Sequence, residues 1–454
     1  MKSRTALSAE SLFEKLSDFF NKVADHRNPS RVEILLKDFL MSGVAIFSLK
    51  IPSLLRFEEE MKDKKKFSHL EGIFGISRVP SDTHMRSVVD EILPKEIIPA
   101  FKMIFSEAQK SHALKGFEIF DNSYLLSVDG TGFFYSDKVH CESCQVKKNK
   151  NSDTRSYYHQ MLAGSIVHPD RNTVIPVAPE MILKQDGSSK NDCERKAMKR
   201  FLNQFREDHP KLKTILLTDA LHATLPNLNH LKILNIGFIL GVKPGSHEKL
   251  FGQMEKYTEL NQMQVFIEEE EIGDKIKKKV IREYRYWNGV LLNHQDTSAT
   301  VNFLDFTETI QWVSSKGELQ EKRVHFSWVT DYSLYESSCK TLARAGRTRW
   351  KIENETFNTL KNQGYEFEHN YGHGNKNLST NFSLLMMLAF LIDQLQEIGC
   401  KLFQENLEKY GRRLAIWSRL QSAYYMIPFK INGYHELLKI ILNPEDFVQA
   451  KNTS

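Results

Sequence analysis

The sequence predicts an α/β protein in which helices flank a mixed sheet, with an inserted β-rich subdomain and a helical N-terminal domain. Three observations predict this fold class. Short apolar strands alternate with amphipathic helix patterns in residues 119–243, strand patterns dominate residues 244–335, and apolar residues recur at helical spacing on both sides of these segments.

Residues 1–118 form the predicted helical N-terminal DNA-binding domain. The segment SAESLFEKLSDFFNKVADHR carries apolar residues at helical spacing behind a serine N-cap. Pro80 and Ser81 can open a short helix that runs to about Ile92, and Pro94 closes it. Two interpretations stay open: a helix-turn-helix that reads a DNA groove, or an ordinary helical cap on the core.

Residues 119–243 form the first part of the predicted catalytic core. Its strands are LLSVDGTGFF, QMLAGSIVH, NTVIPVAPEMIL, KTILLTDA and GFILGVK, and NDCERKAMKRFLNQF is an amphipathic helix. The insertion, residues 244–335, contains a predicted hairpin with turn signals at Asn288-Gly289 and Lys316-Gly317. The string HFSWVTD at its end is expected to return to the main sheet.

Residues 336–400 complete the predicted core, and residues 401–454 form a helical tail. The longest apolar run, residues 382–392, is too short to span a bilayer and predicts a buried helix. Five cysteines, an odd number, argue against a secreted disulfide framework, and the polar start lacks an apolar secretory segment. We therefore expect a cytoplasmic protein with no membrane partner.

Three acidic residues are the candidate catalytic groups. Asp129 lies within an apolar strand, where an ionised carboxylate is costly unless a cation compensates it. Asp219 ends the strand TILLTD, and Glu353 lies in the helix pattern RTRWKIENETF. Phosphodiester cleavage can use two Mg²⁺ ions roughly 4 Å apart, which activate the nucleophile and stabilise the leaving oxygen. Carboxylate oxygens are the ligands that such hard cations need.

The order of these acids, strand Asp129, strand Asp219, β-rich insertion and helix Glu353, resembles the RNase H-like core of bacterial insertion-sequence DDE transposases. It is most similar to the branch whose Glu helix carries the signature Tyr-x2-Arg-x3-Glu-x6-Lys. Arg349 and Glu353 fit the signature within the string RTRWKIENETFNTLK, over a resemblance that covers roughly residues 120 to 400.

The sequence departs from that signature at two positions. Gly346 stands at the Tyr position, and Leu360 stands at the Lys position with Lys361 one residue later. On an ideal helix residue 360 shares the face of Glu353, whereas residue 361 lies about 80° away. Glu355 is the rival of Glu353 as third metal ligand, and we favour Glu353 because it follows Trp350-x-Ile in the family register.

Four basic residues are candidate DNA ligands. The resemblance implies that Arg349 and Lys361 bind phosphates near the scissile bond, and Arg347 and Lys278 are further candidates. A solvated helix face is the alternative explanation of the first pair. We expect Trp350 to pack in the core rather than to stack on a base.

The resemblance implies a transposase that cuts the ends of its element and joins 3′-hydroxyls to target DNA, using Mg²⁺ or Mn²⁺ and two ions per active site. Double-stranded DNA, as terminal inverted repeats and as target, would be the partner, with a homodimer in the synaptic complex and a place at the bacterial nucleoid. The net charge of +5 is compatible with such a polyanionic partner. The alternatives are an RNase H-like nuclease without strand transfer and a non-catalytic, transposase-derived DNA-binding protein.

A second group of residues has the composition of a metal site. His140, Cys141 and Cys144 follow the first core strand, and His159 and Cys193 lie downstream. A Cys-x2-Cys pair with nearby histidines is compatible with zinc, but a second Cys-x2-Cys pair is missing. Zinc ligation and ordinary reduced cysteines both remain open from the sequence.

Overall fold

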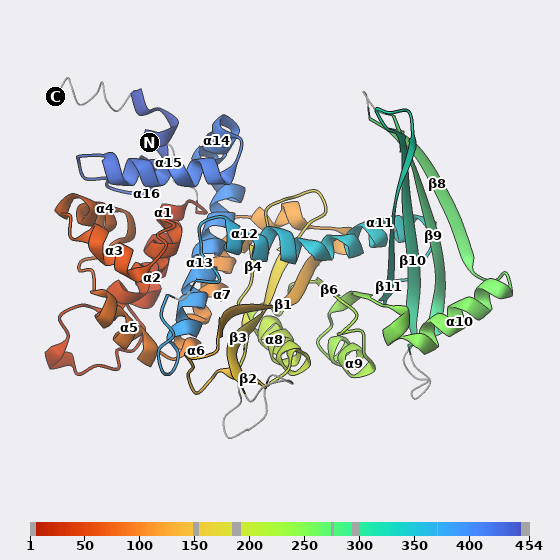
Figure 1. Cartoon of the computed structure of the whole chain (residues 1–454), viewed down its shortest axis with the longest axis horizontal. Helices are drawn as coiled ribbons and strands as arrows, with labels where there is room; N and C mark the ends of the chain where they lie inside the picture. The colour runs from red at the N-terminus through yellow and green to blue at the C-terminus, as the bar shows by residue number, and fades with distance from the viewer. Residues whose placement is uncertain are drawn as a thin grey trace.

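The structure is a computed structural model of the chain, and it describes residues 6–148, 154–183, 192–273, 277–292, 300–369 and 371–445. Within them, helices gather at one end of the molecule, the core sheet lies in the middle, and long strands extend at the other end (Figure 1). The two ends of the predicted domain layout, residues 1–5 and 446–454, lie outside this description.

One mixed sheet runs through the described part of the chain, in the order β2-β3-β1-β6-β7-β11-β10-β9-β8, and β4 and β5 pair with β3. The core strands are β1 (Tyr124–Ser136), β2 (Gln145–Lys148), β3 (Arg155–Val167), β4 (Ile175–Pro176), β5 (Glu180–Ile182), β6 (Thr214–Thr218) and β7 (Gly237–Gly241). The inserted strands are β8 (Gln264–Ile272), β9 (Lys278–Leu291), β10 (Thr300–Val313) and β11 (Leu319–Thr330).

The core strands confirm the predicted fold class. β1 pairs antiparallel with β3 and parallel with β6, and β6 pairs parallel with β7. The helices α8 (Glu194–Asp208) and α9 (Leu225–Ile233) lie below these strands in Figure 1 and provide the crossover connections that parallel strands require. Every residue of β6 is buried, which is why TILLT reads as a continuous apolar run. This arrangement of strands and helices is an RNase H-like fold.

The insertion begins with a helix, α10 (Glu248–Glu259), which the strand patterns do not predict, and continues as four antiparallel strands. The return of HFSWVTD to the main sheet is confirmed, because β11 pairs with β7. Lys316-Gly317 forms the turn between β10 and β11, with Gly317 at φ 79°.

The prediction of a hairpin turn at Asn288-Gly289 is wrong. Both residues lie inside β9, where Gly289 takes φ 76° and the ladder with β10 shifts its register between Val301 and Phe303. The Gly289 amide donates to the Asn302 side chain instead of to the strand ladder. A left-handed glycine thus produces a β-bulge here, a feature with the same sequence signal as a turn.

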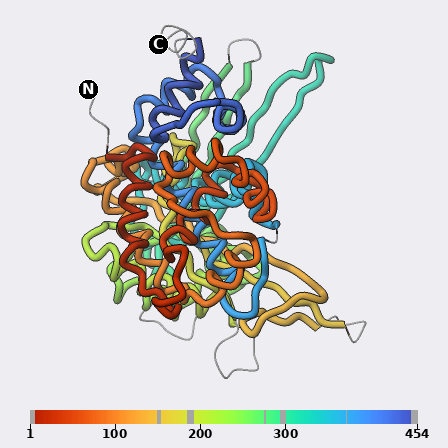
Figure 2. The backbone as a smooth tube through the Cα atoms, turned by 90° about the vertical axis from the view of Figure 1, so that its left-hand side faces the viewer, coloured from red at the N-terminus to blue at the C-terminus, as the bar shows by residue number. Residues whose placement is uncertain are grey.

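The N-terminal and C-terminal helices pack around one long central helix, α13 (Leu378–Gly399). The others are α1 (Ala9–Phe20), α2 (Leu36–Ser48), α3 (Leu54–Met61), α4 (Lys64–Phe74), α5 (Asp82–Glu91), α6 (Pro94–Ile97), α7 (Pro99–Lys110), α14 (Lys401–Tyr410), α15 (Arg413–Met426) and α16 (Tyr434–Leu442). Short 3₁₀ turns lie at Pro29–Arg31, Ala113–Phe117, Phe120–Asn122 and Pro244–Ser246. Figure 2 shows the N-terminal helices in front, with the C-terminal ones above them.

The central helix α13 confirms the expected buried helix. Its length and its mean hydropathy of 1.4 would suffice for a membrane span, but 94 % of its apolar window is buried inside the protein. It packs against α2 and α5 on the N-terminal side and α14 on the C-terminal side. It is therefore the core helix that joins the two ends of the chain.

The helix that carries Glu353 is irregular. α11 (Glu336–Arg347) is followed by a 3₁₀ turn at Thr348–Trp350, a π-helix at Ile352–Phe357 and α12 (Asn358–Asn362). Two hydroxyl contacts fix this stretch to the sheet: Ser127 of β1 donates to the Arg349 carbonyl at 2.8 Å, and Ser165 of β3 lies 3.1 Å from the Thr356 hydroxyl. Irregular helical turns of this type are frequent at functional sites.

Candidate active site

Asp129 and Asp219 occupy matching positions on two adjacent strands. Ser127 of β1 pairs with Leu217 of β6 in parallel register, and each aspartate follows its partner by two residues. Side chains two residues apart in an extended chain share one face, and neighbouring strands lie about 4.8 Å apart. The register therefore places the two aspartates on adjacent chain segments near the end of β6, where the Asp219 carboxylate accepts a hydrogen bond from the Leu221 amide at 3.0 Å.

Arg349 links Glu353 to this position. Its Nη1 atom lies 3.3 Å from Oδ2 of Asp129, and its Nη2 atom donates to Oε1 of Glu353 at 2.7 Å. Because one guanidinium contacts both carboxylates, the helix residue and the strand residue lie on the same side of the sheet. The structure thus brings Asp129, Arg349 and Glu353 into one cluster, next to the strand end that carries Asp219.

Glu355 points to different partners. One of its carboxylate oxygens lies 4.0 Å from Nη1 of Arg413, and burial raises the pKa of this group above its ordinary value. Arg413 also forms a two-point ion pair with Glu397, at 2.5 and 3.0 Å. Glu355 therefore belongs to a half-buried charge cluster between the Glu helix and the C-terminal helices, away from the contact between Arg349 and Asp129.

Glu194, at the first position of α8, also lies beside Asp129. A Cβ placed on Gly130 would meet Oε2 of Glu194 at 2.7 Å, and Oε1 of the same carboxylate lies 2.9 Å from Nε2 of His222, three residues after Asp219. In the sequence, helix capping alone explains Glu194. Only the fold shows that the glycine after Asp129 leaves room for this fourth carboxylate.

The acids around Asp129 explain its electrostatics. Burial raises the pKa of Asp129 to about 6, the Arg349 guanidinium and the Gly130 amide act in the opposite direction, and the charges of Glu353 and Glu194 raise it further. Burial and the neighbouring acids therefore disfavour the ionised carboxylate more than Arg349 and the Gly130 amide stabilise it. Binding of a divalent cation would stabilise the ionised form of such a carboxyl group, and its oxygen atoms are ligands that hard cations prefer.

The π-helix accounts for the displaced lysine. A π-turn accommodates one residue more than an α-turn, so a residue eight positions after Glu353 takes the direction that a residue seven positions on has in a regular helix. Leu360 is accordingly fully buried, while Lys361 is part-exposed and pairs with Glu368 at 2.7 Å. The ideal-helix assumption is thus wrong for this stretch.

A tryptophan accounts for the missing tyrosine. A Cβ on Gly346 would lie 2.6 Å from Cε2 of Trp328, whose indole ring is 5 % exposed and packs over the glycine from β11. No larger side chain fits between α11 and that ring. Trp328 therefore leaves room for glycine at the position where the family signature has tyrosine.

Of the other candidate DNA ligands, Arg347 lines a groove of about 430 Å³ between α11 and the insertion. It pairs with Glu308 at 3.1 Å and lies over the rings of Phe306 and Phe326. Trp350 lines the same groove and is 44 % exposed, so the prediction that it packs in the core is wrong. The 3₁₀ turn at Thr348–Trp350 directs this ring outward.

Lys278 begins β9 and lies 5.7 Å from the centre of the Trp312 ring. The basic residues beyond it are largely neutralised by the acidic run on β8. Lys279 pairs with Glu269, and Arg282 pairs with Glu270. The sheet places these opposite charges side by side, so this face of the insertion is not uniformly basic.

The fold and the site define the class first: the chain is an RNase H-like α/β protein in which Asp129, Arg349 and Glu353 form one cluster next to the end of β6. The family follows from comparison with known proteins. The family model described as "Transposase DDE domain" matches residues 124–391, more than half of the chain, and the chain belongs to this family of DDE transposases. Comparison with curated proteins gives no match. Members are DNA-cleaving enzymes that generally use divalent metal ions.

Proposed function

We propose that this transposase cleaves the ends of an insertion sequence and joins the 3′-hydroxyls to target DNA, with Asp129, Asp219 and Glu353 as metal ligands. The observation that carries the proposal is the shared guanidinium of Arg349, which places the helix carboxylate beside the strand carboxylate. The parallel register of β1 and β6 supports Asp219 as the third member.

The donor set fits Mg²⁺ or Mn²⁺. It consists of carboxylates alone, and the raised pKa of Asp129 marks a group that lacks sufficient compensating charge. When bound, two such ions would activate the attacking hydroxyl and neutralise the leaving oxygen. Asp129 and Asp219 would hold them from the sheet, and Glu353 from the helix. Arg349, whose side chain is 28 % exposed, would exchange its carboxylate partners for a DNA phosphate when cations bind them.

The DNA would lie across the Glu helix. Lys361 lines a cavity of about 860 Å³ together with Gly132, Tyr135 and Lys147 of the β1-β3 region. On the other side, Trp350 and Arg347 line the groove toward the insertion. Basic groups and an exposed ring on each side of Glu353, Tyr135 on one and Trp350 on the other, suit a phosphate backbone and unstacked bases near the cut. Two ends held together would require two copies of the chain.

The test uses the purified protein with DNA that carries the two flanks of its own gene, and Mg²⁺. We expect strand cleavage at the element ends and, with pre-cleaved ends, covalent joining to a second DNA. Asp129→Asn should abolish both products while it still binds DNA. Cleavage without joining would identify a nuclease, and binding without cleavage would identify a non-catalytic DNA-binding protein; either result would overturn the proposal.

A further inference from the structure

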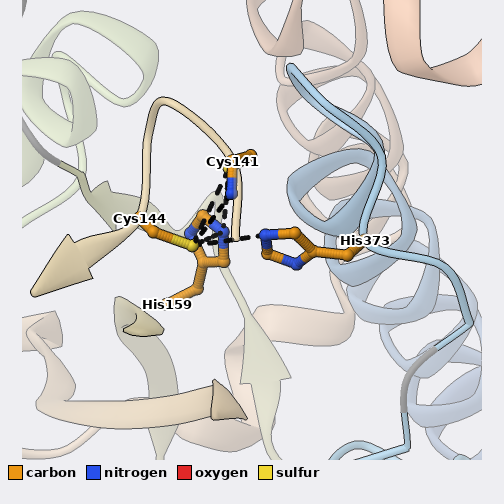
Figure 3. A group of neighbouring side chains, drawn as sticks. All are labelled: Cys141, Cys144, His159 and His373. Carbon is orange, nitrogen blue, oxygen red and sulfur yellow. Dashed lines mark hydrogen bonds between the residues drawn. The ribbon is translucent and has the colours of Figure 1, made fainter. Parts of the chain in front are cut away.

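Four side chains outside the catalytic cluster meet at one point: Cys141, Cys144, His159 and His373 (Figure 3). All four are buried, and one ligand atom from each lies within 4.8 Å of the others. The two cysteines come from the loop between β1 and β2, His159 comes from β3, and His373 comes from the segment between α12 and α13.

The distances between these atoms match a tetrahedron around one ion. The two Sγ atoms lie 3.9 Å apart, Nε2 of His159 lies 3.4 and 3.3 Å from them, and Nε2 of His373 lies 3.2 Å from Sγ of Cys144. With Zn–S bonds of about 2.3 Å and Zn–N bonds of about 2.0 Å, a tetrahedral site has S···S distances of about 3.8 Å and S···N distances of about 3.5 Å. The side chains are therefore already placed for zinc.

The surroundings hold the imidazoles in this orientation. A bulge in β1 at Phe133 lets two consecutive rings face the cluster: Phe133 stacks on His159, and Phe134 stacks on His373 at 4.0 Å between ring centres. The Cys141 amide donates to Sγ of Cys144 at 3.5 Å, a contact that favours a thiolate. Both Nε2 atoms point inward (Figure 3).

We propose that these residues form a structural zinc site. Two sulfur and two nitrogen ligands in a tetrahedron favour Zn²⁺ over the hard cations that carboxylates hold. Four protein ligands leave no open position, which is typical of structural rather than catalytic zinc. The site ties together segments 229 residues apart. It also fixes one wall of the cavity that Lys361 lines, because His159 belongs to both.

The structure separates this site from the residues that the sequence groups with it. His140 is exposed and stacks on Tyr157 at 4.3 Å between ring centres, and it does not belong to the group of four converging side chains. Cys193 is exposed at the N-cap of α8. His373, which lies beyond the Glu helix, takes the fourth position. These two outer residues provide matched controls for substitutions in the cluster.

The experiment measures zinc per chain by elemental mass spectrometry, on full-length protein purified in reducing buffer and passed through a chelator. We expect about one zinc per chain in the wild type and in His140→Ala, Cys193→Ser and Asp129→Asn. Cys144→Ser and His373→Ala should lose it, and His373→Cys, which supplies a thiolate instead, should keep it.

Two results would overturn the proposal. One is a wild-type protein that holds no zinc and takes up none from added Zn²⁺, including the case in which thiol counting shows a Cys141–Cys144 disulfide. The other is full zinc occupancy in His373→Ala. The wild-type measurement decides the question even if a variant fails to fold, and because Asp129→Asn should keep its zinc, the outcome is independent of the catalytic proposal.

Discussion

The Nη1 atom of Arg349 lies 3.3 Å from Oδ2 of Asp129, although 220 residues separate the two in sequence. The contact crosses from the irregular helix to the first core strand and is supported by the hydrogen bond from Ser127 to the Arg349 carbonyl. The same guanidinium holds Glu353. The contact with Arg349 therefore distinguishes Glu353, which belongs to the acidic cluster, from Glu355, which pairs with Arg413.

Glu353→Gln and Glu355→Gln should differ in their effects. We expect Glu353→Gln to lower the rate of DNA cleavage by about 10³-fold or more, because it removes a metal-binding charge. Glu355→Gln should leave cleavage within a few-fold of wild type and alter mainly thermal stability, since its carboxylate faces Arg413. Cleavage rates at saturating Mg²⁺ and melting curves distinguish them. If Glu355→Gln abolished cleavage and Glu353→Gln did not, Glu355 would be the metal ligand and Glu353 the structural residue.

Glu194→Gln tests the fourth carboxylate. The amide keeps an oxygen acceptor for His222 but removes a negative charge beside Asp129. We expect a cleavage rate about tenfold lower at limiting Mg²⁺, with a smaller loss at saturating Mg²⁺. Glu207→Gln, an exposed change on the same helix, serves as the control. Equal Mg²⁺ dependence in both variants would contradict a role near the metal.

Lys361 tests the register that the π-helix sets. Lys361→Ala should weaken DNA binding and reduce the salt dependence of log K by about one unit of slope, as the loss of one phosphate contact would. The double change Leu360→Lys with Lys361→Leu restores the spacing of the family signature. It should nonetheless be inactive and less stable, because position 360 is fully buried. Recovery of activity in the double variant would refute the altered register.

Gly346→Ala tests the contact with Trp328. In a free helix this change stabilises by about 1 kcal/mol, whereas here the methyl group meets the indole ring, and we expect a loss of about 1 to 3 kcal/mol. Trp328→Leu should relieve that penalty, so the two substitutions should couple in a double-mutant cycle measured by denaturant unfolding. Additive effects would show that the contact does not limit position 346.

His209 gives the fold a pH dependence. Its ring is buried against Phe105 and Phe205, and burial lowers the pKa to about 4 from 6.5. The unfolded chain therefore binds the proton more tightly, and stability is lost as the pH falls from about 6.5 toward 4, by up to about 3 kcal/mol. His209→Phe should flatten this part of the stability curve in unfolding measurements. An unchanged slope would assign the acid sensitivity to other groups.

The sequence predicts β1, β3, β6 and β7 because each contains an apolar run, as TILLT shows. The strand β2 has the sequence QVKK, which contains no such run, and it is not predicted. Asp129 and Asp219 are recognisable because they interrupt or end such a run, whereas Glu353 is recognised from the signature string around Arg349. Contacts between distant segments leave no local trace, so neither the place of Glu194 beside Gly130 nor that of His373 beside Cys144 follows from spacing. Trp350 is mispredicted because a 3₁₀ turn rotates it out of the apolar stripe.

The hydrogen bonds between β7 and β11 have a mechanical consequence. Since Trp328–Gly241, Val329–Leu240 and Thr330–Ile239 are paired, the inserted strands continue the core sheet, and strand pairing joins the insertion to the core in addition to the chain connections. The twelve residues of β11 span roughly 40 Å at about 3.3 Å each. Because pairing with β7 fixes its inner end, β11 holds its outer end at a set distance from the edge of the core sheet.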